Sequence, residues 1–554
     1  MTRRERSSLL LLWFFLGLLP LLVRPLWEPD EARYAEIPRE MLATGDWLTP
    51  HLNGVLYFEK PPLQYWLSAL SMKLFGVSGA AARLPLALAS GLMIWAAWRL
   101  AKRLGARDPL WAPFMAATGL LAFLVGQLLT LDALFSSFLV AAVAAFVEAV
   151  VRRRQSDPSL AWTLLTFVLL AGAMLTKGLA EVILTGGILL FSLLFAWKDA
   201  DLRRAVIRTA MDPLGWLLYL LLVAPWFWAV NRANPGHAQF FFVHEHFTRF
   251  LTHEHARQGS SNWLLDKLYF IGILALGLLP WLSATVMGLK RSWTFLEGRG
   301  PQGQNHLARW VVGITVLAFL WPLVFFSLSG SKLPPYLLPA IVPLAALACT
   351  FEREGEQQLA LRRLGKELLL LGGVFLLAAG FFRKDLEGLA WLLALGLGFA
   401  GLGLWVHRPR GWTGSRLRVA MGGALWLLIL VAQAAAGPGK SVLELVRMSP
   451  ANAQWISFGT YFQGLPFYAR TRAVVVAGTG ELAYGRDRLP DAARWFQEDP
   501  AALGAMADRL KAEDPSRPVL LLAKTANWKQ LSASERSRWE EVTRNSAAVV
   551  ARRR

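Results

Sequence analysis

Acidic and basic side chains are concentrated in residues 27–41 (WEPDEARYAEIPREM), directly after the first apolar segment of the chain. Asp30 and Glu31 come first, and Arg33 and Tyr34 follow on the next turn of a predicted helix. Carboxylates beside a fixed cation and a hydroxyl could bind or activate a polar substrate at a membrane surface. The structural alternative is a solvated helix start, in which the helix dipole stabilises the acidic side chains.

A second charged segment, residues 57–66 (YFEKPPLQYW), contains Glu59 and Lys60 before two prolines. The prolines stop any helix at this point and make the chain rigid. Apolar and aromatic residues surround the two charges, so both are expected at an interface. A surface salt bridge is the structural alternative.

Isolated charges also interrupt the apolar runs. Asp132 begins one run (LTLDALFSSF), Lys177 lies between two closely spaced runs (MLTKGLAE), and Lys332 precedes another (LSGSKLPPYLLP). A charge at this depth is costly unless it faces a polar cavity. Two such lysines predict an anionic ligand. A helix cap is the alternative for Asp132, and snorkelling to lipid headgroups is the alternative for the lysines.

Four of the eight histidines lie in residues 244–258 (HEHFTRFLTHEHARQ), namely His244, His246, His253 and His255. A metal site is one interpretation, with Glu59 as an oxygen ligand. A solvated loop is the other, because an i, i+2 spacing does not place two side chains on one helix face. Arg249 in the same stretch is a candidate for an anion contact. The glycines of AGTGELAYG lack the strand–loop–helix frame with lysine, so no nucleotide is expected.

The elements that must position these residues are mostly membrane helices. The chain has 554 residues, of which 55% are hydrophobic and 17% charged, which predicts an α-helical polytopic membrane protein. Matching to about 20 residues per crossing gives about thirteen spans. They lie near 8–26, 79–103, 109–128, 131–151, 161–176, 179–197, 213–231, 263–289, 307–328, 335–351, 366–382, 388–407 and 417–436.

The charge pattern predicts the orientation of these spans. The net charge is +20, and the basic residues cluster in short segments between alternate apolar runs, such as RRER, VRRR and HRPRGWTGSR. This pattern places the N-terminus in the cytoplasm and residues 27–78, 232–262 and 437–554 outside. It also makes a nucleic-acid partner a weak interpretation. The first apolar run lacks a small-residue cleavage site and is expected to stay as a transmembrane helix.

The segment after residue 437 is no longer membrane-like. RAVVVAG and PVLLLAK predict buried strands, and DAARWFQEDPAALGAMADRLKA predicts one or two helices with Asp491 as a cap. We therefore expect a transmembrane domain over residues 1–436 and a soluble α/β domain over 437–554. The single cysteine, Cys349, excludes an intrachain disulfide.

Several of these segments together resemble a known family. WEPDEARYAEIPREMLATGDWLTPHLNGVLYFEKPP, MLTKG, VHEHFTRF and FFSLSGSKLPPYLLP resemble bacterial lipid A aminoarabinose transferases. These are polyprenyl-phosphate-dependent membrane glycosyltransferases related to protein O-mannosyltransferases. The resemblance covers about residues 8–351. It implies an inner-membrane enzyme with an outward-facing site. The implied donor is 4-amino-4-deoxy-L-arabinose on undecaprenyl phosphate, and the acceptor is a lipid A phosphate.

The resemblance also implies roles for the candidate residues. Asp30 matches an aspartate near the acceptor and would act as a base or hold the sugar ammonium, and Asp132 is a second catalytic candidate. Glu59 matches a position proposed to hold a divalent metal with a histidine such as His244. The substrate-binding candidates are Arg33, Tyr34, Tyr57, Lys60, Lys177, Arg249, Lys332 and Tyr336. A transferase for another sugar or acceptor, or a lipid flippase, are the alternatives.

Overall fold

The computed structural model divides into two compact units. Its described residues are 1–554 except 249–262, 299–304, 331, 351–356, 382–385 and 408–413. One unit, here called the helical unit, combines Met1–Leu21 with Pro85–Val431. The other, here called the mixed unit, combines Leu22–Leu84 with Ala432–Arg554. The N-terminal residues 27–41 and 57–66 therefore fold together with the C-terminal segment in the mixed unit.

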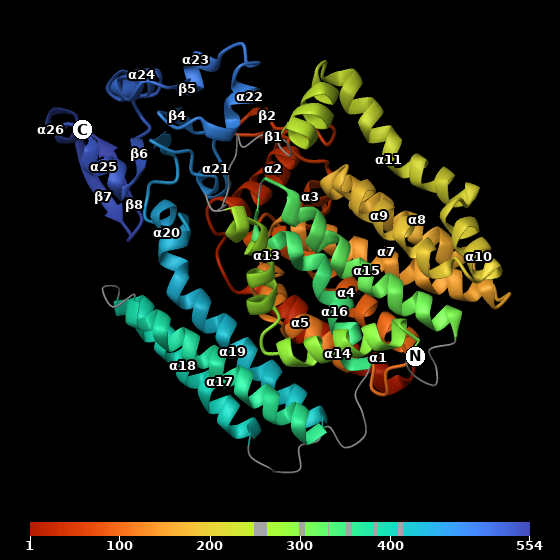
Figure 1. The fold of residues 1–554 in the computed structure, drawn as a ribbon. Coiled ribbons are helices and arrows are strands. Elements are labelled where there is room, and N and C mark those ends of the chain that lie inside the picture. Colours follow the sequence, from red (N-terminus) through yellow and green to blue (C-terminus); the bar gives the residue numbers. More distant parts are fainter. Residues whose placement is uncertain (249–262, 299–304, 331, 351–356, 382–385, 408–413) are drawn as a thin grey trace. The chain divides into compact units, whose positions relative to one another are not determined.

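The helical unit consists mainly of apolar helices (Figure 1). Helices α4 and α19 continue into the mixed unit. The elements are α1 (Arg3–Leu12), η1 (Trp13–Leu18), η2 (Leu19–Leu22), α4 (Gly79–Arg103), α5 (Trp111–Thr118), α6 (Leu120–Val125), α7 (Leu131–Arg154), α8 (Leu160–Lys177), α9 (Ala180–Ala196), α10 (Ala200–Ala210), α11 (Pro213–Ala233), η3 (Gln239–Thr248), α13 (Trp263–Gly277), α14 (Leu282–Leu296), α15 (His306–Leu328), η4 (Pro334–Leu337), α16 (Leu338–Thr350), α17 (Gln357–Phe381), α18 (Leu386–His407) and α19 (Gly414–Lys440).

Each predicted span falls on one helix or on two or three consecutive helical elements. By length and composition, six helices among the described residues could cross a membrane, or seven if one bent pair counts as a span. Shorter apolar helices accompany them, such as Ala180–Ala196 and Pro334–Thr350. The structure thus confirms a helical membrane architecture, and the number thirteen stays a prediction.

The predicted span 263–289 is not one straight helix. Leu264–Gly277 and Leu282–Leu296 meet at an angle of 114°. Pro280 lies in the break, where proline removes a backbone donor and cannot continue a helix. Glu367 accepts hydrogen bonds from the backbone N–H groups of Leu282 (2.8 Å) and Ser283 (2.7 Å), which satisfies the exposed amides at the start of α14.

The N-terminal part of the mixed unit contains two helices and a short hairpin. Helix α2 (Asp30–Thr44) ends at Gly45, which adopts the left-handed conformation with φ +76° that suits glycine. The short strands β1 (His51–Leu52) and β2 (Val55–Leu56) form a hairpin. Helix α3 (Leu63–Phe75) begins directly after Pro61 and Pro62, as the two prolines predict.

The C-terminal part of the mixed unit contains a six-stranded sheet in the order β5-β4-β3-β6-β8-β7. The first four strands in this order are parallel to one another. Strand β8 pairs antiparallel with β6, and β7 pairs antiparallel with β8. The strands are β3 (Gln454–Phe458), β4 (Val474–Val476), β5 (Phe496–Gln497), β6 (Val519–Lys524), β7 (Trp539–Arg544) and β8 (Ala548–Arg553). The α/β character and the predicted strands β4 and β6 are confirmed.

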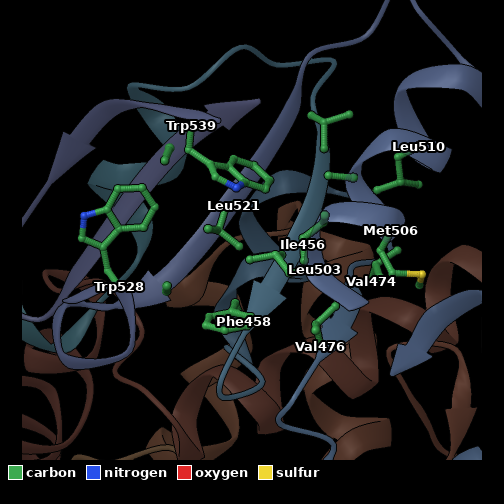
Figure 2. Close-up of a cluster of buried hydrophobic side chains, with 14 of the residues drawn as sticks. Ile456, Phe458, Val474, Val476, Leu503, Met506, Leu510, Leu521, Trp528 and Trp539 are labelled. Atoms are coloured by element: carbon green, nitrogen blue, oxygen red, sulfur yellow. The ribbon is translucent and has the colours of Figure 1, made fainter. Parts of the chain in front are cut away.

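Both faces of the central parallel strands β3, β4 and β6 are buried, as is typical of parallel sheets. On one face, Ile456, Val474 and Leu521 pack with Leu503 and Met506 (Figure 2). The last two residues belong to α24 (Leu503–Glu513). On the other face, residues such as Trp455, Leu520 and Val550 pack with α20 (Leu443–Arg447) and α21 (Gly464–Ala469).

The region predicted as one or two helices contains a small strand as well. Helix α23 (Ala492–Trp495) is followed by β5 and later by α24. Asp491 is at the N-cap position of α23 but makes no capping bond. Its Oδ2 accepts a hydrogen bond from Trp495 Nε1 (3.0 Å). The sequence could not predict β5, because two residues are too few to show a periodicity. Only pairing with β4 defines this strand.

Candidate active site

Asp30 is an accessible carboxylate held by a buried arginine. It is the first residue of α2, and its side chain is 54% exposed. Arg33 Nη2 donates to Asp30 Oδ1 (2.8 Å), and Arg33 Nη1 contacts Glu481 Oε2 (3.0 Å) and Tyr57 Oη (3.3 Å). The guanidinium is thus fixed on several sides, and it orients Asp30 while leaving that carboxylate open to a ligand.

Glu481 is a site residue that the sequence interpretation missed. It lies in η5 (Gly480–Leu482), within the glycine-rich AGTGELAYG, which lacks the frame of a nucleotide-binding loop. Gln463 Nε2 donates to its other carboxylate oxygen. The position of this loop could have identified Glu481 from the sequence. The loop follows the carboxyl end of parallel strand β4, and α/β sheets place functional groups at that end of their strands.

A second buried carboxylate, Glu28, fixes the same region. Its oxygens accept backbone N–H bonds from Gln463 (2.9 Å) and Gly464 (2.7 Å). Burial raises the pKa of Glu28 to about 7, although both amides favour the charged form. Two contacts therefore connect residues 27–41 to the C-terminal part of the mixed unit. Glu28 accepts from the backbone of Gln463 and Gly464, and Arg33 pairs with Glu481.

Glu31, adjacent to Asp30, has a purely structural environment. It is buried and forms ion pairs with Arg24 and Arg83. Its Oε2 also accepts the backbone N–H of Trp27 (3.0 Å). Burial opposes ionisation, but the two guanidinium groups outweigh it and hold the pKa of Glu31 at about 2. The two acidic residues at the start of α2 thus differ fully in exposure and partners.

The remaining candidates of the mixed unit surround Arg33 or follow it in the first loop. Tyr34 is buried, lies 5.6 Å from the Arg33 guanidinium, and stacks on Tyr65 with ring centroids 6.1 Å apart. Glu59 and Lys60 are half-buried, and Lys60 Nζ donates to the backbone carbonyl of Glu59 (2.6 Å). This lysine therefore binds the backbone of the residue before it.

In the helical unit, Asp132 and Lys177 form an ion pair between the start of α7 and the end of α8. The N-cap residue of α7 is Thr130, and no side chain caps this helix, so Asp132 is not a helix cap. Its carboxylate pairs with Lys177 instead. Lys177 Nζ also lies 4.5 Å from the centroid of the Tyr336 ring. Asp132, Lys177 and Tyr336 thus meet although they are distant in sequence.

Lys332 lies inside the helical unit, with no exposed surface. Its Nζ donates to the carbonyls of Ser327 (3.0 Å) and Ser329 (2.6 Å) and lies 3.4 Å from Asp266 Oδ2. This burial disfavours snorkelling to lipid headgroups. Asp266, on α13, is a second residue that the sequence interpretation missed. Its position in the first turn of an apolar helix, like that of Asp132, could have identified it.

The aromatic ring of Phe326 connects these two lysine sites. It packs on Tyr336 with ring centroids 4.9 Å apart and on Phe270 with centroids 6.5 Å apart. Lys332 Nζ lies 5.8 Å from the Phe270 ring. The helical unit therefore holds two ammonium groups, each with a carboxylate partner, beside one aromatic cluster.

The predicted arginine and histidines of residues 244–255 lie wholly or partly outside the described residues. Arg249 lies outside the described residues, as do His253 and His255. The backbone of His244 belongs to η3, but its side chain and that of His246 are outside the description. Within the part of the chain that the structure describes, no three His, Cys, Asp or Glu side chains form a group able to hold a metal. The metal site with Glu59 and His244 therefore stays a prediction.

Comparison with known proteins places this fold in a family. A family model for dolichyl-phosphate-mannose-protein mannosyltransferases matches residues 59–228. An undecaprenyl phosphate-α-4-amino-4-deoxy-L-arabinose arabinosyl transferase of Sodalis glossinidius (strain morsitans) is 36% identical over 354 residues, 63% of this chain and 59% of that relative. Matches in Edwardsiella ictaluri and Aeromonas hydrophila similarly cover 63% and 61% of those proteins, so the chain spans about three fifths of these relatives.

Longer matches exist as well. The crystal structure of ArnT from Cupriavidus metallidurans bound to undecaprenyl phosphate has a TM-score of 0.74 and 25% identity, covering 100% of this chain and 98% of that one. The arabinosyl transferase of Pseudomonas aeruginosa (strain LESB58) is 33% identical over 458 residues, 78% of this chain and 76% of that protein. The chain therefore belongs to the family of undecaprenyl phosphate-α-4-amino-4-deoxy-L-arabinose arabinosyl transferases.

Proposed function

We propose that this protein transfers 4-amino-4-deoxy-L-arabinose from undecaprenyl phosphate to a phosphate group of lipid A at the outer face of the inner membrane. The names of its relatives and the lipid bound to the similar ArnT structure support the donor. The observation that carries the proposal is the pair of ammonium groups, Lys177 and Lys332, beside one aromatic cluster that includes Phe270, Phe326 and Tyr336.

The chemistry of transfer explains why such cations are useful. An acceptor phosphate oxygen attacks the anomeric carbon of the sugar from the side opposite the donor phosphate, so the configuration inverts. The bond between that carbon and the donor phosphate oxygen breaks, and the electron pair leaves with undecaprenyl phosphate. The donor phosphodiester becomes a monoester with more negative charge, which cations placed in advance stabilise.

Lys177 is the residue proposed to stabilise the negative charge that develops on the donor phosphate. Its ammonium is partly exposed and already oriented by Asp132, and a donor phosphate would replace the carboxylate as its partner. Lys332 is fully buried and held by carbonyls, so it is proposed to contribute positive potential and to position Tyr336 through the shared aromatic cluster. Lys60 and Arg249 are proposed as further phosphate contacts.

Asp30 is proposed to bind the sugar ammonium. A phosphomonoester is already largely anionic at neutral pH, so the acceptor needs little help from a base. The exposed carboxylate fixed by Arg33 suits a cationic ligand. Its action as a base is the second version of this proposal. A divalent metal at Glu59 and His244 is likewise a proposal, and no step above depends on it.

Transfer of radiolabel tests the function. Membranes containing the full chain, given undecaprenyl-phosphate-linked [14C]aminoarabinose and lipid A, are expected to yield labelled lipid A. Lys177→Ala should reduce labelling about tenfold or more, since a charge-assisted contact is worth about 1.5–3 kcal/mol. Lys198→Ala, an exposed lysine between α9 and α10, is the matched control. Movement of the donor without covalent label would indicate a flippase, and label only with another donor would indicate a different sugar.

The orientation needs its own experiment. Lys529 is exposed in the mixed unit, and the native Cys349 is buried. Lys529→Cys should react with a membrane-impermeant thiol reagent in intact spheroplasts, because the charge pattern places residues 437–554 outside. Labelling only after lysis would place the mixed unit in the cytoplasm and overturn the outward-facing site.

A further inference from the structure

A cavity of about 540 Å³ in the helical unit lies away from every residue assigned above. Its walls come from α1 with η1 and η2, from the start of α5, and from α19. Its volume is within the range of about 300–1,000 Å³ typical of small-molecule sites. The lining side chains are mostly apolar and include Leu12, Phe15, Leu16, Phe114 and Trp426.

Two arginines supply positive charge to this apolar cavity. Arg4 is the second residue of α1 and Arg418 is the fifth residue of α19, so each lies near the start of its helix. Arg4 is exposed, and within the described part of the chain its guanidinium has no hydrogen bond or ion pair. Arg418 Nη1 contacts Asp108 Oδ2 (3.0 Å), and the guanidinium lies 4.9 Å from the Trp111 ring.

The nearby carboxylates do not cancel this charge. Asp108 is 42% exposed and engages one nitrogen of Arg418, and among the described residues the other nitrogens of that guanidinium have no hydrogen-bond acceptor. Glu5, next to Arg4, has its own partners: Lys102 Nζ at 3.7 Å and Trp98 Nε1 at 3.4 Å. The cavity therefore joins an apolar wall to guanidinium groups with free donors.

The two arginines belong to segments that the charge pattern assigns to the cytoplasmic face, RRER and HRPRGWTGSR. Anionic lipids enrich that leaflet, and basic pockets between membrane helices bind their headgroups. Along the first helix the cavity extends from Arg4 to Leu19, roughly 22 Å at 1.5 Å per residue. This length exceeds one leaflet of a hydrocarbon core about 30 Å thick.

We propose that this cavity binds one anionic diacyl phospholipid of the cytoplasmic leaflet. Its phosphate contacts Arg4 and Arg418, and an acyl chain lies between α1 and α19. Charge complementarity selects an anionic headgroup, and the apolar wall selects a long aliphatic chain. A zwitterionic phospholipid, a detergent molecule or an empty groove are the competing outcomes of the test.

Two glycines in the wall allow the cavity to be filled without disturbing the protein. Gly422 and Gly423 line it, and a Cβ atom added at either position would meet no atom within 4 Å. A larger residue also favours a helix more than glycine does. Gly423→Phe should therefore occupy the cavity while α19 stays folded. Gly398→Leu on α18 is a matched control, because its added Cβ also meets open space and it lies outside the cavity.

Native mass spectrometry of the full chain in detergent, titrated with phosphatidylglycerol or phosphatidylcholine, tests the proposal. We expect one retained phosphatidylglycerol with about tenfold preference over phosphatidylcholine, as charge-assisted contacts predict. The double variant Arg4→Gln, Arg418→Gln should lose this preference, and Gly423→Phe should lose the bound lipid. Arg6→Gln and Gly398→Leu should behave as the unmodified chain.

Three results would overturn the assignment. The first is equal retention of both lipids by the unmodified chain. The second is an unchanged preference in the double arginine variant with a normal size-exclusion profile. The third is undiminished lipid retention in Gly423→Phe, which keeps both arginines and so tests the cavity even if the arginine variants fold poorly.

Discussion

Adjacent residues Asp30 and Glu31 should respond in opposite ways to removal of their charge. Glu31→Gln removes a buried carboxylate that holds Arg24 and Arg83 together. Asp30→Asn removes an exposed carboxylate with one ion pair, and its partner Arg33 keeps Glu481. We therefore expect Glu31→Gln to lower stability and Asp30→Asn to abolish transfer without unfolding the protein.

The size of the first effect follows from the ion pairs. The pKa of Glu31 is about 2 in place of the ordinary 4.5, which corresponds to about 3 kcal/mol at ~1.36 kcal/mol per pKa unit. Breaking a buried ion pair typically costs about 3–5 kcal/mol. For a unit of this size, ~1 kcal/mol shifts the unfolding temperature by about 2–4 °C, so a decrease of roughly 6–12 °C is expected. The contribution is present above about pH 4.5 and lost as pH falls toward 2.

Thermal unfolding in detergent and transfer of labelled sugar, measured on the same preparations, separate the two roles. Asp30→Asn should keep the unfolding temperature within about 2 °C, since an exposed ion pair is worth about 0–1 kcal/mol. If Asp30 binds the sugar ammonium, a donor without the amine should be insensitive to this substitution. Normal stability of Glu31→Gln, or normal transfer by Asp30→Asn, would refute the division between a structural and a functional carboxylate.

Three further outcomes are expected. Lys332→Met should lower the unfolding temperature because it removes the buried ammonium that pairs with Asp266 and leaves that carboxylate only the more exposed Lys267, at 3.5 Å. Adding Asp266→Asn should recover part of the loss in a double-mutant cycle. Arg33→Lys should reduce transfer at normal expression, because one ammonium cannot reproduce the fork that contacts separate acceptors. Stability should fall as pH rises from about 4.5 through about 7, because burial raises the pKa of Glu28 to about 7 and the folded chain binds that proton more tightly than the unfolded chain. In thermal unfolding, Glu28→Gln should reduce this loss of stability between pH 5 and pH 8.

Local sequence was sufficient to predict most of the elements. Apolar runs of span length became helices, because no other element satisfies its own backbone in a membrane. The prolines before residue 63 set the start of α3, and the apolar runs of β4 and β6 indicated strands buried on both faces. Isolated charges in apolar surroundings identified Asp132, Lys177 and Lys332 as special, since burying such groups without partners is costly.

Tertiary structure alone decided which of these groups meet. Lys177 pairs with Asp132 across 45 positions, and Arg33 contacts Glu481 from the other end of the chain. The same distant packing buries Glu31 and exposes Asp30, although the sequence presents them as neighbours of equal chemistry. Periodicity reports which face of an element is apolar, whereas the partner of a charge depends on how elements distant in sequence pack against one another. That information does not exist in any local stretch of residues, and here it separates a structural carboxylate from one open to a ligand.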